Sequence, residues 1–138
     1  MPSTRKTSPL RSLAERYTAA WCSQDAARVA AFYSPKGSLA INDGPPAVGR
    51  QAIAAAAQTF MSSFPDLRVV MDALETHGKK NATYRWTLTG TNTGPGGSGN
   101  RVAISGHEEW TIGPDGLIAE SRGHFDGDDF KRQITHGV

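Results

Sequence analysis

The chain has 138 residues, of which 38% are hydrophobic and 20% are charged, so it can bury the core of one domain and stay soluble. Its 15 Lys and Arg and 13 Asp and Glu leave a scattered net charge of +2, which argues against nucleic-acid or membrane-surface binding. No apolar run approaches the roughly 20 residues of a membrane span, and none follows the first residues as in a secretory signal. The single cysteine, Cys22, cannot form an internal disulfide, and we expect a cytoplasmic protein.

Helical periodicity marks the first part of the chain. Ser8 and Pro9 fit the cap and the first turn of a helix. The apolar residues of this helix share one face at the 3.6-residue period: Leu10, Leu13, Tyr17 and Trp21. A second helix is expected from Asp25, whose carboxylate can cap it, until Pro35 stops it.

A third helix is expected after a short strand and a turn. Residues 38–41 fit the strand, and residues 42–46 (Asn-Asp-Gly-Pro-Pro) fit the turn. The helix should begin near Gly49, carry Phe60 on its apolar face and end at Pro65.

After Pro65 the apolar period changes from 3.6 residues to 2, which is typical of strands. Four strands joined by short links are predicted: Leu67–Thr76, Ala82–Asn92, Val102–Ile112 and Leu117–Phe125. A last short helix should begin near Asp128. We expect one domain over residues 9–134, between an N-terminal flexible arm (1–8) and a C-terminal tail (135–138). Helices followed by strands indicate an α+β fold, with helices on one face of a curved, mainly antiparallel sheet and a ligand cavity at its open end.

Two segments resemble ligand-binding motifs but fit other structures better. Residues 94–99 have the glycine spacing of a dinucleotide loop, yet they lie between two strands, where no helix N-terminus can face a phosphate. We expect a mobile hairpin tip there. Residues 126–129 (Asp-Gly-Asp-Asp) lack the length and the later glutamate of a calcium loop, and fit a strand end and a helix cap. No metal site is predicted.

The strand 102–112 places one carboxyl group among apolar residues. Glu108 shares a face with Ile104, Gly106 and Trp110, whereas Glu109 lies on the opposite face. A carboxyl that faces an apolar interior should have a raised pKa, which suits a proton-transfer group. The alternative is that Glu108 pairs with an inward arginine and only holds the sheet.

Further candidates lie on neighbouring elements. The strand 117–126 has four ionisable residues on one side, which is typical of a solvated or subunit-facing surface: Glu120, Arg122, His124 and Asp126. A bulge would rotate the strand end and aim Asp126 into the cavity, where it could share a proton network with His124. In the strand 82–92, Trp86 belongs to the buried face and Arg85 to the opposite one. Tyr17 needs a hydrogen-bond partner if it is buried, although an ordinary core role is the alternative.

Several segments are more specific together than each is alone. In chain order they are Glu15-Arg16-Tyr17, Trp21, Asp25, Phe32-Tyr33-Ser34-Pro35, Pro46–Ile53, Arg85-Trp86-Thr87, Gly90–Gly94, Gly116-Leu117-Ile118 and Phe125-Asp126. This pattern resembles the SnoaL-like and ketosteroid-isomerase-like proteins of the nuclear-transport-factor-2-like superfamily. The resemblance implies a cone-shaped α+β barrel wrapped on three N-terminal helices, with a deep apolar pocket, and often a homodimer formed through the outer sheet face. It does not fix a reaction, because members include isomerases, cyclases, dehydratases, epoxide hydrolases and non-catalytic modules.

The ketosteroid-isomerase resemblance assigns roles to two residues. Tyr17 falls where those enzymes place the oxyanion-hole tyrosine, and Glu108 falls where they place the protonated acid beside it. Their proton-shuttling base falls at Ile41, which cannot transfer a proton.

Resemblance to limonene-epoxide-hydrolase-like enzymes gives a second set. Asn42, Arg85 and Asp126 match a water-positioning amide, the central arginine and one acid. The tyrosine and the second aspartate of that site become Ala40 and Thr87. Asp126 also matches the acid/base aspartate of SnoaL-like polyketide cyclases, which use no cofactor.

These observations predict a cofactor-independent enzyme of the isomerase, cyclase, dehydratase or hydrolase type that acts on a small, mostly apolar molecule. Asp126 would be the general acid/base, while Tyr17 and protonated Glu108 would donate hydrogen bonds to a developing oxyanion. Arg85 and His124 would position substrate or water. The side chains expected to bind the substrate are Asn42, Trp86, Trp110, Trp21 and Phe60. The competing expectations are a non-catalytic small-molecule-binding or dimerisation module and a protein-interaction domain.

Overall fold

The first helix begins where the sequence predicts it. The computed structural model describes residues 8–138, so the expected N-terminal arm lies outside the described residues except for Ser8. The Ser8 hydroxyl accepts a hydrogen bond from the backbone N–H of Arg11 (3.1 Å) and caps α1 (Pro9–Cys22). This contact satisfies one of the N–H groups that every helix start leaves unpaired.

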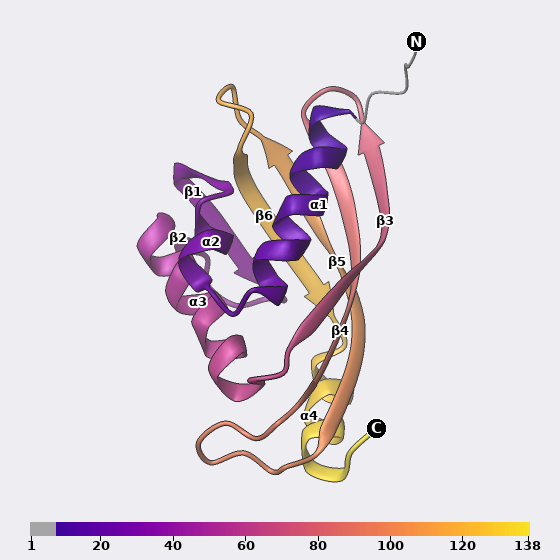
Figure 1. The fold of residues 1–138 in the computed structure, drawn as a ribbon. Helices are drawn as coiled ribbons and strands as arrows, with labels where there is room; N and C mark the ends of the chain where they lie inside the picture. Colours follow the sequence, from indigo (N-terminus) through magenta and orange to yellow (C-terminus); the bar gives the residue numbers. More distant parts are fainter. Residues whose placement is uncertain (1–7) are drawn as a thin grey trace.

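Within residues 8–138, three further helices and six strands follow (Figure 1). The helices are α2 (Ala26–Ala30), α3 (Arg50–Ser63) and α4 (Gly127–His136). The strands are β1 (Tyr33–Ile41), β2 (Ala47–Val48), β3 (Arg68–His77), β4 (Asn81–Thr91), β5 (Arg101–Ile112) and β6 (Ile118–Phe125). They form one sheet in the order β2-β1-β6-β5-β4-β3, with β1 and β6 parallel and the other neighbours antiparallel. Because β2 and β3 remain its edges, the curved sheet is not closed.

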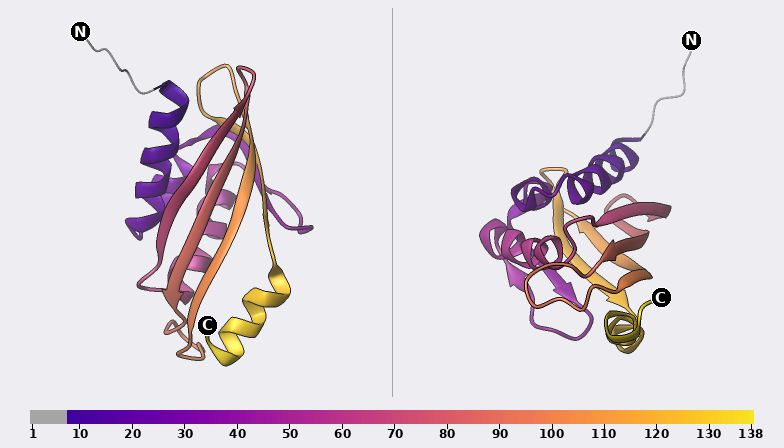
Figure 2. Two further views of the ribbon diagram at one scale, coloured as in Figure 1. Left: turned by 90° about the vertical axis from the view of Figure 1, so that its right-hand side faces the viewer. Right: turned by 60° about the horizontal axis from the view of Figure 1, so that its bottom comes forward.

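The helices α1, α2 and α3 lie on the inner face of this sheet, with α1 along β3 and α3 beside β1 (Figures 1 and 2). The short α4 lies across the end of the sheet against β5, and it includes residues 135–136 of the expected tail. The hydrophobic core fills the space between helices and sheet, as expected for an α+β fold. None of the helices in the described part of the chain is long and apolar enough to cross a membrane.

The second helix is shorter, and the next strand longer, than the sequence predicts. The helix was expected to reach Pro35, but β1 already begins at Tyr33. A register shift between Tyr33 and Ser38 in the β1–β6 pairing accommodates Pro35, which has no backbone N–H to donate. The bulge also needs Gly37, because a Cβ there would lie 2.9 Å from the carbonyl oxygen of Ile118.

The glycine-rich segment 94–99 connects β4 to β5, so a strand rather than a helix follows it. Asn92 anchors the loop: its Oδ1 accepts a hydrogen bond from the backbone N–H of Ser98 (2.9 Å), and its Nδ2 donates to the carbonyl oxygen of Ser63 (3.2 Å). The loop is thereby fixed to the end of α3, which the composition alone did not predict.

The strand pairing confirms the predicted alternation of faces. Two rows of residues cross the inner face of β4, β5 and β6: Tyr84, Glu108 and Gly123, and next to them Trp86, Gly106 and Phe125. Glycine at position 106 leaves space for the neighbouring indole, because a Cβ there would lie 2.6 Å from Cζ2 of Trp86. The shape of the inner face therefore depends on Gly106.

Replacing Gly106 with alanine should lower the free energy of unfolding by about 1–3 kcal/mol, the usual range for an overpacked interior. The added methyl group would overlap the Trp86 indole and the backbone carbonyl of His124, from which its carbon would be 2.4 Å away. Urea unfolding followed by circular dichroism measures the change. Gly127→Ala is the control, because a Cβ there meets no other atom closer than 3.5 Å. Equal stability of the two variants would contradict this account.

Candidate functional site

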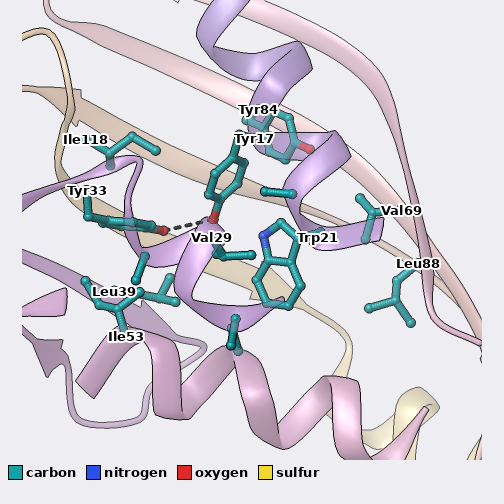
Figure 3. Close-up of a cluster of buried hydrophobic side chains, with 14 of the residues drawn as sticks. Tyr17, Trp21, Val29, Tyr33, Leu39, Ile53, Val69, Tyr84, Leu88 and Ile118 are labelled. Carbon is teal, nitrogen blue, oxygen red and sulfur yellow. Dashed lines mark hydrogen bonds between the residues drawn. The ribbon is translucent and has the colours of Figure 1, made fainter. Parts of the chain in front are cut away.

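A cavity with about 620 Å³ of empty space, its open mouth included, lies between the inner face of the sheet and the helices. Trp21 at the end of α1, Phe60 of α3 and Phe130 of α4 line it from the helical side. The strands add aliphatic and aromatic side chains and one carboxyl group, that of Glu108. Figure 3 shows part of this wall, with Trp21 facing the strands. The mostly apolar lining with a single carboxyl group is typical of a site for a small, mostly apolar molecule.

Glu108 is the single acidic residue in the cavity wall, and β5 positions it there. Its neighbours across the sheet are Tyr84 and Gly123, which line the cavity too. Because Gly123 has no side chain, it leaves the space beside the Glu108 carboxyl open. The alternation along β5 therefore confirms that Glu108 faces the apolar interior.

The Glu108 carboxyl is held by three side-chain donors. Its Oε1 accepts hydrogen bonds from Trp110 Nε1 (2.8 Å), Ser121 Oγ (2.8 Å) and the Tyr17 hydroxyl (3.1 Å). Its Oε2 has only the longer contact with the same hydroxyl (3.3 Å). Oε2 is therefore the oxygen with capacity left for a molecule in the cavity.

The other expectation for Glu108, a pairing with an inward arginine, is wrong. None of the ion pairs within residues 8–138 includes Glu108. Burial raises the pKa of Glu108 above the usual carboxyl range, although the hydrogen bonds from Trp110, Ser121 and Tyr17 oppose this effect. The carboxyl thus holds its proton at a pH where an exposed glutamate is ionised, which suits proton transfer.

Tyr17 supports Glu108 from behind and is not part of the cavity wall. Its ring is fully buried, and its hydroxyl lies 2.9 Å from that of Tyr33. Figure 3 marks this contact between the two hydroxyl groups with a dashed line. A phenol has one proton, so if Tyr17 donates to Glu108, the hydroxyl of Tyr33 donates to Tyr17. Burial raises the pKa of Tyr17 well above its ordinary value and keeps it a neutral donor.

Two partners of this cluster were missed by the sequence analysis. Ser121 lies on the apolar face of β6, where a polar residue among apolar neighbours is a recognisable signal. Tyr33 gave no such signal, because it was placed at the end of a helix, whereas it begins β1.

Asp126, the expected general acid/base, does not line the cavity. It is exposed and caps α4, where its Oδ1 accepts a hydrogen bond from the backbone N–H of Asp129 (3.0 Å). The only register shift between β5 and β6 lies between Thr111 and Ile112, at the other end of the pairing. The expected bulge is therefore missing near Asp126, and Phe125 is the last inward residue of β6.

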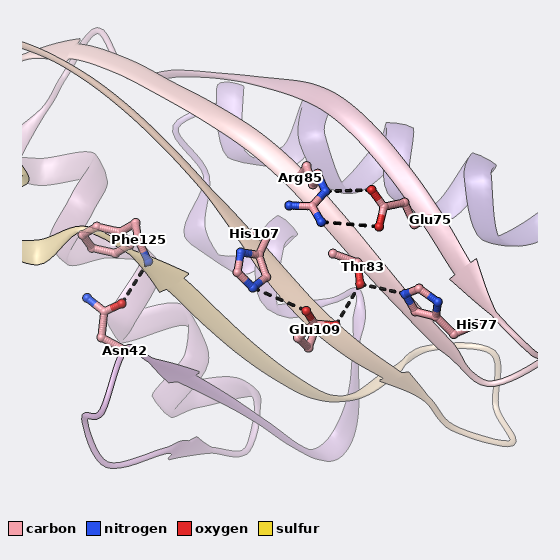
Figure 4. Close-up of polar contacts among 8 residues, drawn as sticks. All are labelled: Asn42, Glu75, His77, Thr83, Arg85, His107, Glu109 and Phe125. Carbon is pink, nitrogen blue, oxygen red and sulfur yellow. Dashed lines mark hydrogen bonds and ion pairs between the residues drawn. The ribbon is translucent and has the colours of Figure 1, made fainter.

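The other expected polar residues also lie away from the cavity. Arg85 is on the outer face of the sheet, where its Nε is 2.7 Å from Oε2 of Glu75 (Figure 4). His124 is on the same outer face, and its ring lies 5.0 Å from that of His107. Asn42 accepts a hydrogen bond from the backbone N–H of Phe125 (3.0 Å), so it holds the strand end instead of lining the wall.

The residues expected to bind substrate divide into two groups. Trp21, Phe60 and Trp86 line the cavity. Trp110 is buried behind the wall, where its indole N–H donates to Glu108. Within residues 8–138 there is no cluster of three His, Cys, Asp or Glu side chains that could hold a metal ion. Independence from cofactors stays a prediction.

The raised pKa of Glu108 predicts a pH dependence of stability. The folded protein holds this proton more tightly than the unfolded chain does, so wild-type stability should fall as pH rises from the ordinary carboxyl range through the folded pKa. Glu108→Gln resembles the protonated form and should lose this part of the dependence. Urea unfolding of both proteins across that pH range measures the difference.

Glu15→Gln is the control, because Glu15 is an exposed residue that pairs with Arg11. This variant should follow the wild-type pH profile. A difference between wild type and Glu108→Gln that stays constant with pH, or that favours the wild type as pH rises, would contradict the raised pKa.

Comparisons with known proteins agree with this fold. No curated protein sequence matches the chain significantly. Among solved structures, a candidate SnoaL-like polyketide cyclase from Jannaschia sp. CCS1 is 20% identical, with 98% of this chain and 100% of that chain covered and a TM-score of 0.76. An NTF2-like protein of unknown function from Burkholderia pseudomallei is 17% identical, with 94% and 99% covered and a TM-score of 0.79.

A third similar structure is that of SalBIII, an epoxide hydrolase/cyclase-like enzyme in pyran ring formation in the polyether salinomycin. It is 15% identical, with 86% of this chain and 92% of that chain covered and a TM-score of 0.75. At these identities the three structures show the fold alone. A family model described as the SnoaL-like domain matches residues 14–121, which is most of the chain. The protein therefore belongs to the SnoaL-like family, with a nuclear-transport-factor-2-like fold.

Proposed function

We propose that this protein is a cytoplasmic, cofactor-independent acid/base enzyme that acts on a small, mostly apolar molecule in the cavity. The observation that supports this most is the Glu108 carboxyl, which is buried, has a raised pKa and keeps one oxygen lightly bonded. No other charged side chain is found in the cavity wall that the structure describes. A general acid or base is most effective when its pKa lies near the working pH.

Glu108 is the better candidate for the acid/base role that the sequence analysis gave to Asp126. Glu108 lines the cavity and its Oε2 has only one long contact, whereas the Asp126 carboxyl is exposed and occupied as a helix cap. Tyr17, Trp110 and Ser121 act as positioning residues in this proposal, because they bond the carboxyl and not the bound molecule.

A single carboxyl group favours isomerisation among the reaction types of this family. The carboxylate of Glu108 would remove a proton from the carbon that lies between a carbonyl group and a C=C bond. The C–H electron pair would form a new C=C bond to the carbonyl carbon, and the carbonyl π electrons would move onto oxygen to give a dienolate. Glu108 would then return the proton to the far carbon of the original C=C bond, which re-forms the carbonyl and leaves the C=C bond conjugated with it. Glu108 then returns to its starting state, so no second titratable group is required. Hydrolysis, in contrast, would need a further group that positions and activates a water molecule.

The alternative is a non-catalytic module that binds a small molecule in the same cavity. Protonated Glu108 could donate a hydrogen bond from Oε2 to an oxygen of the ligand and keep its proton. The sparse polar lining, with one carboxyl in an apolar wall, supports this reading as well. Proton exchange with the bound molecule separates the two functions.

The first test uses β-tetralone, a small apolar ketone, dissolved with the protein in deuterated water. The enzyme proposal predicts that wild type accelerates deuterium incorporation beside the carbonyl, and that Glu108→Gln lowers this rate about 100-fold or more. Proton NMR measures the exchange, and Glu15→Gln should match the wild type. Ketone binding without accelerated exchange in the wild type would support the binding module instead. Equal exchange rates for wild type and Glu108→Gln would exclude Glu108 as the acid/base.

We also propose a homodimer formed through the outer face of the sheet. Helices α1 to α3 lie on the inner face and α4 lies across one end of the sheet, so within residues 8–138 no helix covers the outer side of β3 to β6. Side chains such as Thr83 and His107 form a polar network on this open face (Figure 4). An uncovered sheet face with many hydrogen-bonding groups is suited to a two-fold symmetric contact.

Sedimentation equilibrium should give twice the chain mass for the wild type. Ser105→Glu would place two negative charges, one from each copy, close to a two-fold contact and should shift the protein toward the monomer, whereas Gln58→Glu on the exposed side of α3 should leave the mass unchanged. A monomeric wild type would exclude the dimer.

A further inference from the structure

A buried hydrogen-bond donor in the cavity wall has no acceptor. Trp86 lines the cavity from β4, and its indole Nε1 is the only buried side-chain nitrogen or oxygen without a partner in residues 8–138. The Nε1 of Trp110, in contrast, donates to Glu108. Leaving a buried donor unpaired destabilises a folded protein, so a native example requires an explanation such as a bound water or a ligand.

The local packing offers this N–H no strong acceptor. The Trp86 indole packs edge to face with the ring of Phe125, with the ring centres 5.9 Å apart. The face of a phenyl ring is a much weaker acceptor than an oxygen atom. Gly106 lies beside the indole without a side chain, so it contributes no acceptor of its own beyond the backbone.

The strand register brings Trp86 close to the proposed acid/base. Tyr84 pairs with Glu108, and Trp86 pairs with Gly106, so Trp86 and Glu108 are diagonal neighbours on the inner face. Such neighbours are about 7–8 Å apart along the sheet. At this separation an indole ring and a glutamate side chain can both contact one small molecule that lies between them.

We propose that the Trp86 indole N–H donates a hydrogen bond to a carbonyl oxygen of the substrate while Glu108 takes the proton from the adjacent carbon. The inference rests on the proposed function and adds the substrate class, a small apolar ketone or a comparable carbonyl compound. In this step the C–H bond breaks, the proton bonds to Glu108 Oε2, and the electron pair forms the C=C bond of an enolate. Negative charge therefore develops on the oxygen that Trp86 contacts, and a donor fixed at that oxygen stabilises the transition state more than the ground state.

This assignment replaces Tyr17 as the expected oxyanion donor. The Tyr17 hydroxyl is already bonded to Glu108 and Tyr33, and Tyr17 does not line the cavity. The Trp86 N–H has no competing partner, so a substrate oxygen would satisfy it without breaking a bond of the protein.

The binding test compares β-tetralone with tetralin, the hydrocarbon that has the same fused rings and lacks the carbonyl oxygen. Wild type should bind the ketone about five- to tenfold more tightly than the hydrocarbon, the usual effect of one hydrogen bond. Trp86→Phe keeps an aromatic ring without the N–H, and should reduce this preference to less than about twofold. Phe60→Leu is the control: it removes ring area from the same cavity, and should weaken both probes while keeping their ratio.

A spectroscopic measurement tests the contact itself. The indole N–H signal of Trp86 is identified by its loss from the nitrogen–proton NMR spectrum of Trp86→Phe. In the wild type this signal should shift downfield when the ketone is added, and much less when the hydrocarbon is added. Any one of three results would overturn the inference. They are a ketone preference that is unchanged in Trp86→Phe, an indole N–H signal that does not shift when the ketone is added, and a wild type that does not bind the ketone.

The two proposals fail in different ways. If Trp86 governs the ketone preference but no deuterium exchange occurs, the contact stands and the protein is a carbonyl-binding module. If Glu108 governs exchange and Trp86→Phe keeps the ketone preference, the enzymatic proposal stands and the role of Trp86 is excluded.

Discussion

A carboxyl group buried without a cation must either hold its proton or collect enough hydrogen bonds to support a charge. Glu108 is in this position, and much of the surrounding structure is arranged around it. Helix α1 supplies Tyr17, β5 supplies Trp110 and β6 supplies Ser121, so three separate elements meet at one carboxyl oxygen. Removing any one donor would leave the others in place but would raise the free energy of the ionised form further.

The space beside the Glu108 carboxyl is open because its neighbours on the sheet have no side chains. Glycine occupies the neighbouring positions 106 and 123, so no side chain fills the space beside the carboxyl or under the Trp86 indole. Aromatic rings from three helices and the sheet surround that space. A low local polarity strengthens every electrostatic interaction inside, which is the physical basis for proton transfer at a buried site.

The sequence predicted those features that follow from periodicity. Alternation along β5 was sufficient to place Glu108 inside and Glu109 outside, and the 3.6-residue period placed Tyr17 toward the sheet. Features that depend on a single irregularity were not predictable in this way. Strand β1, with its register shift between Tyr33 and Ser38, begins at Tyr33, where the sequence predicted the end of a helix. No register shift occurs near Phe125, so Asp126 lies outside the cavity.

Among the residues assigned through family resemblance, those on regular elements lie where the resemblance implies, whereas others do not. Glu108 and Tyr17 lie together as the ketosteroid-isomerase pattern implies, since both are fixed by regular elements. Arg85, which the epoxide-hydrolase pattern places in the site, lies on the outer face of β4 and pairs with Glu75. A sequence match identifies the residue type but does not reveal to which face a strand turns it.

The most direct test of the central claim is a titration of the Glu108 carboxyl carbon by NMR, with Glu108→Gln used to identify its signal. The account predicts that Glu108 releases its proton at a pH above the ordinary carboxyl range, because burial without a cation raises its pKa. A midpoint at or below that of the exposed glutamates would show that the buried carboxyl is stably ionised, and would contradict its role as the proton-transfer group.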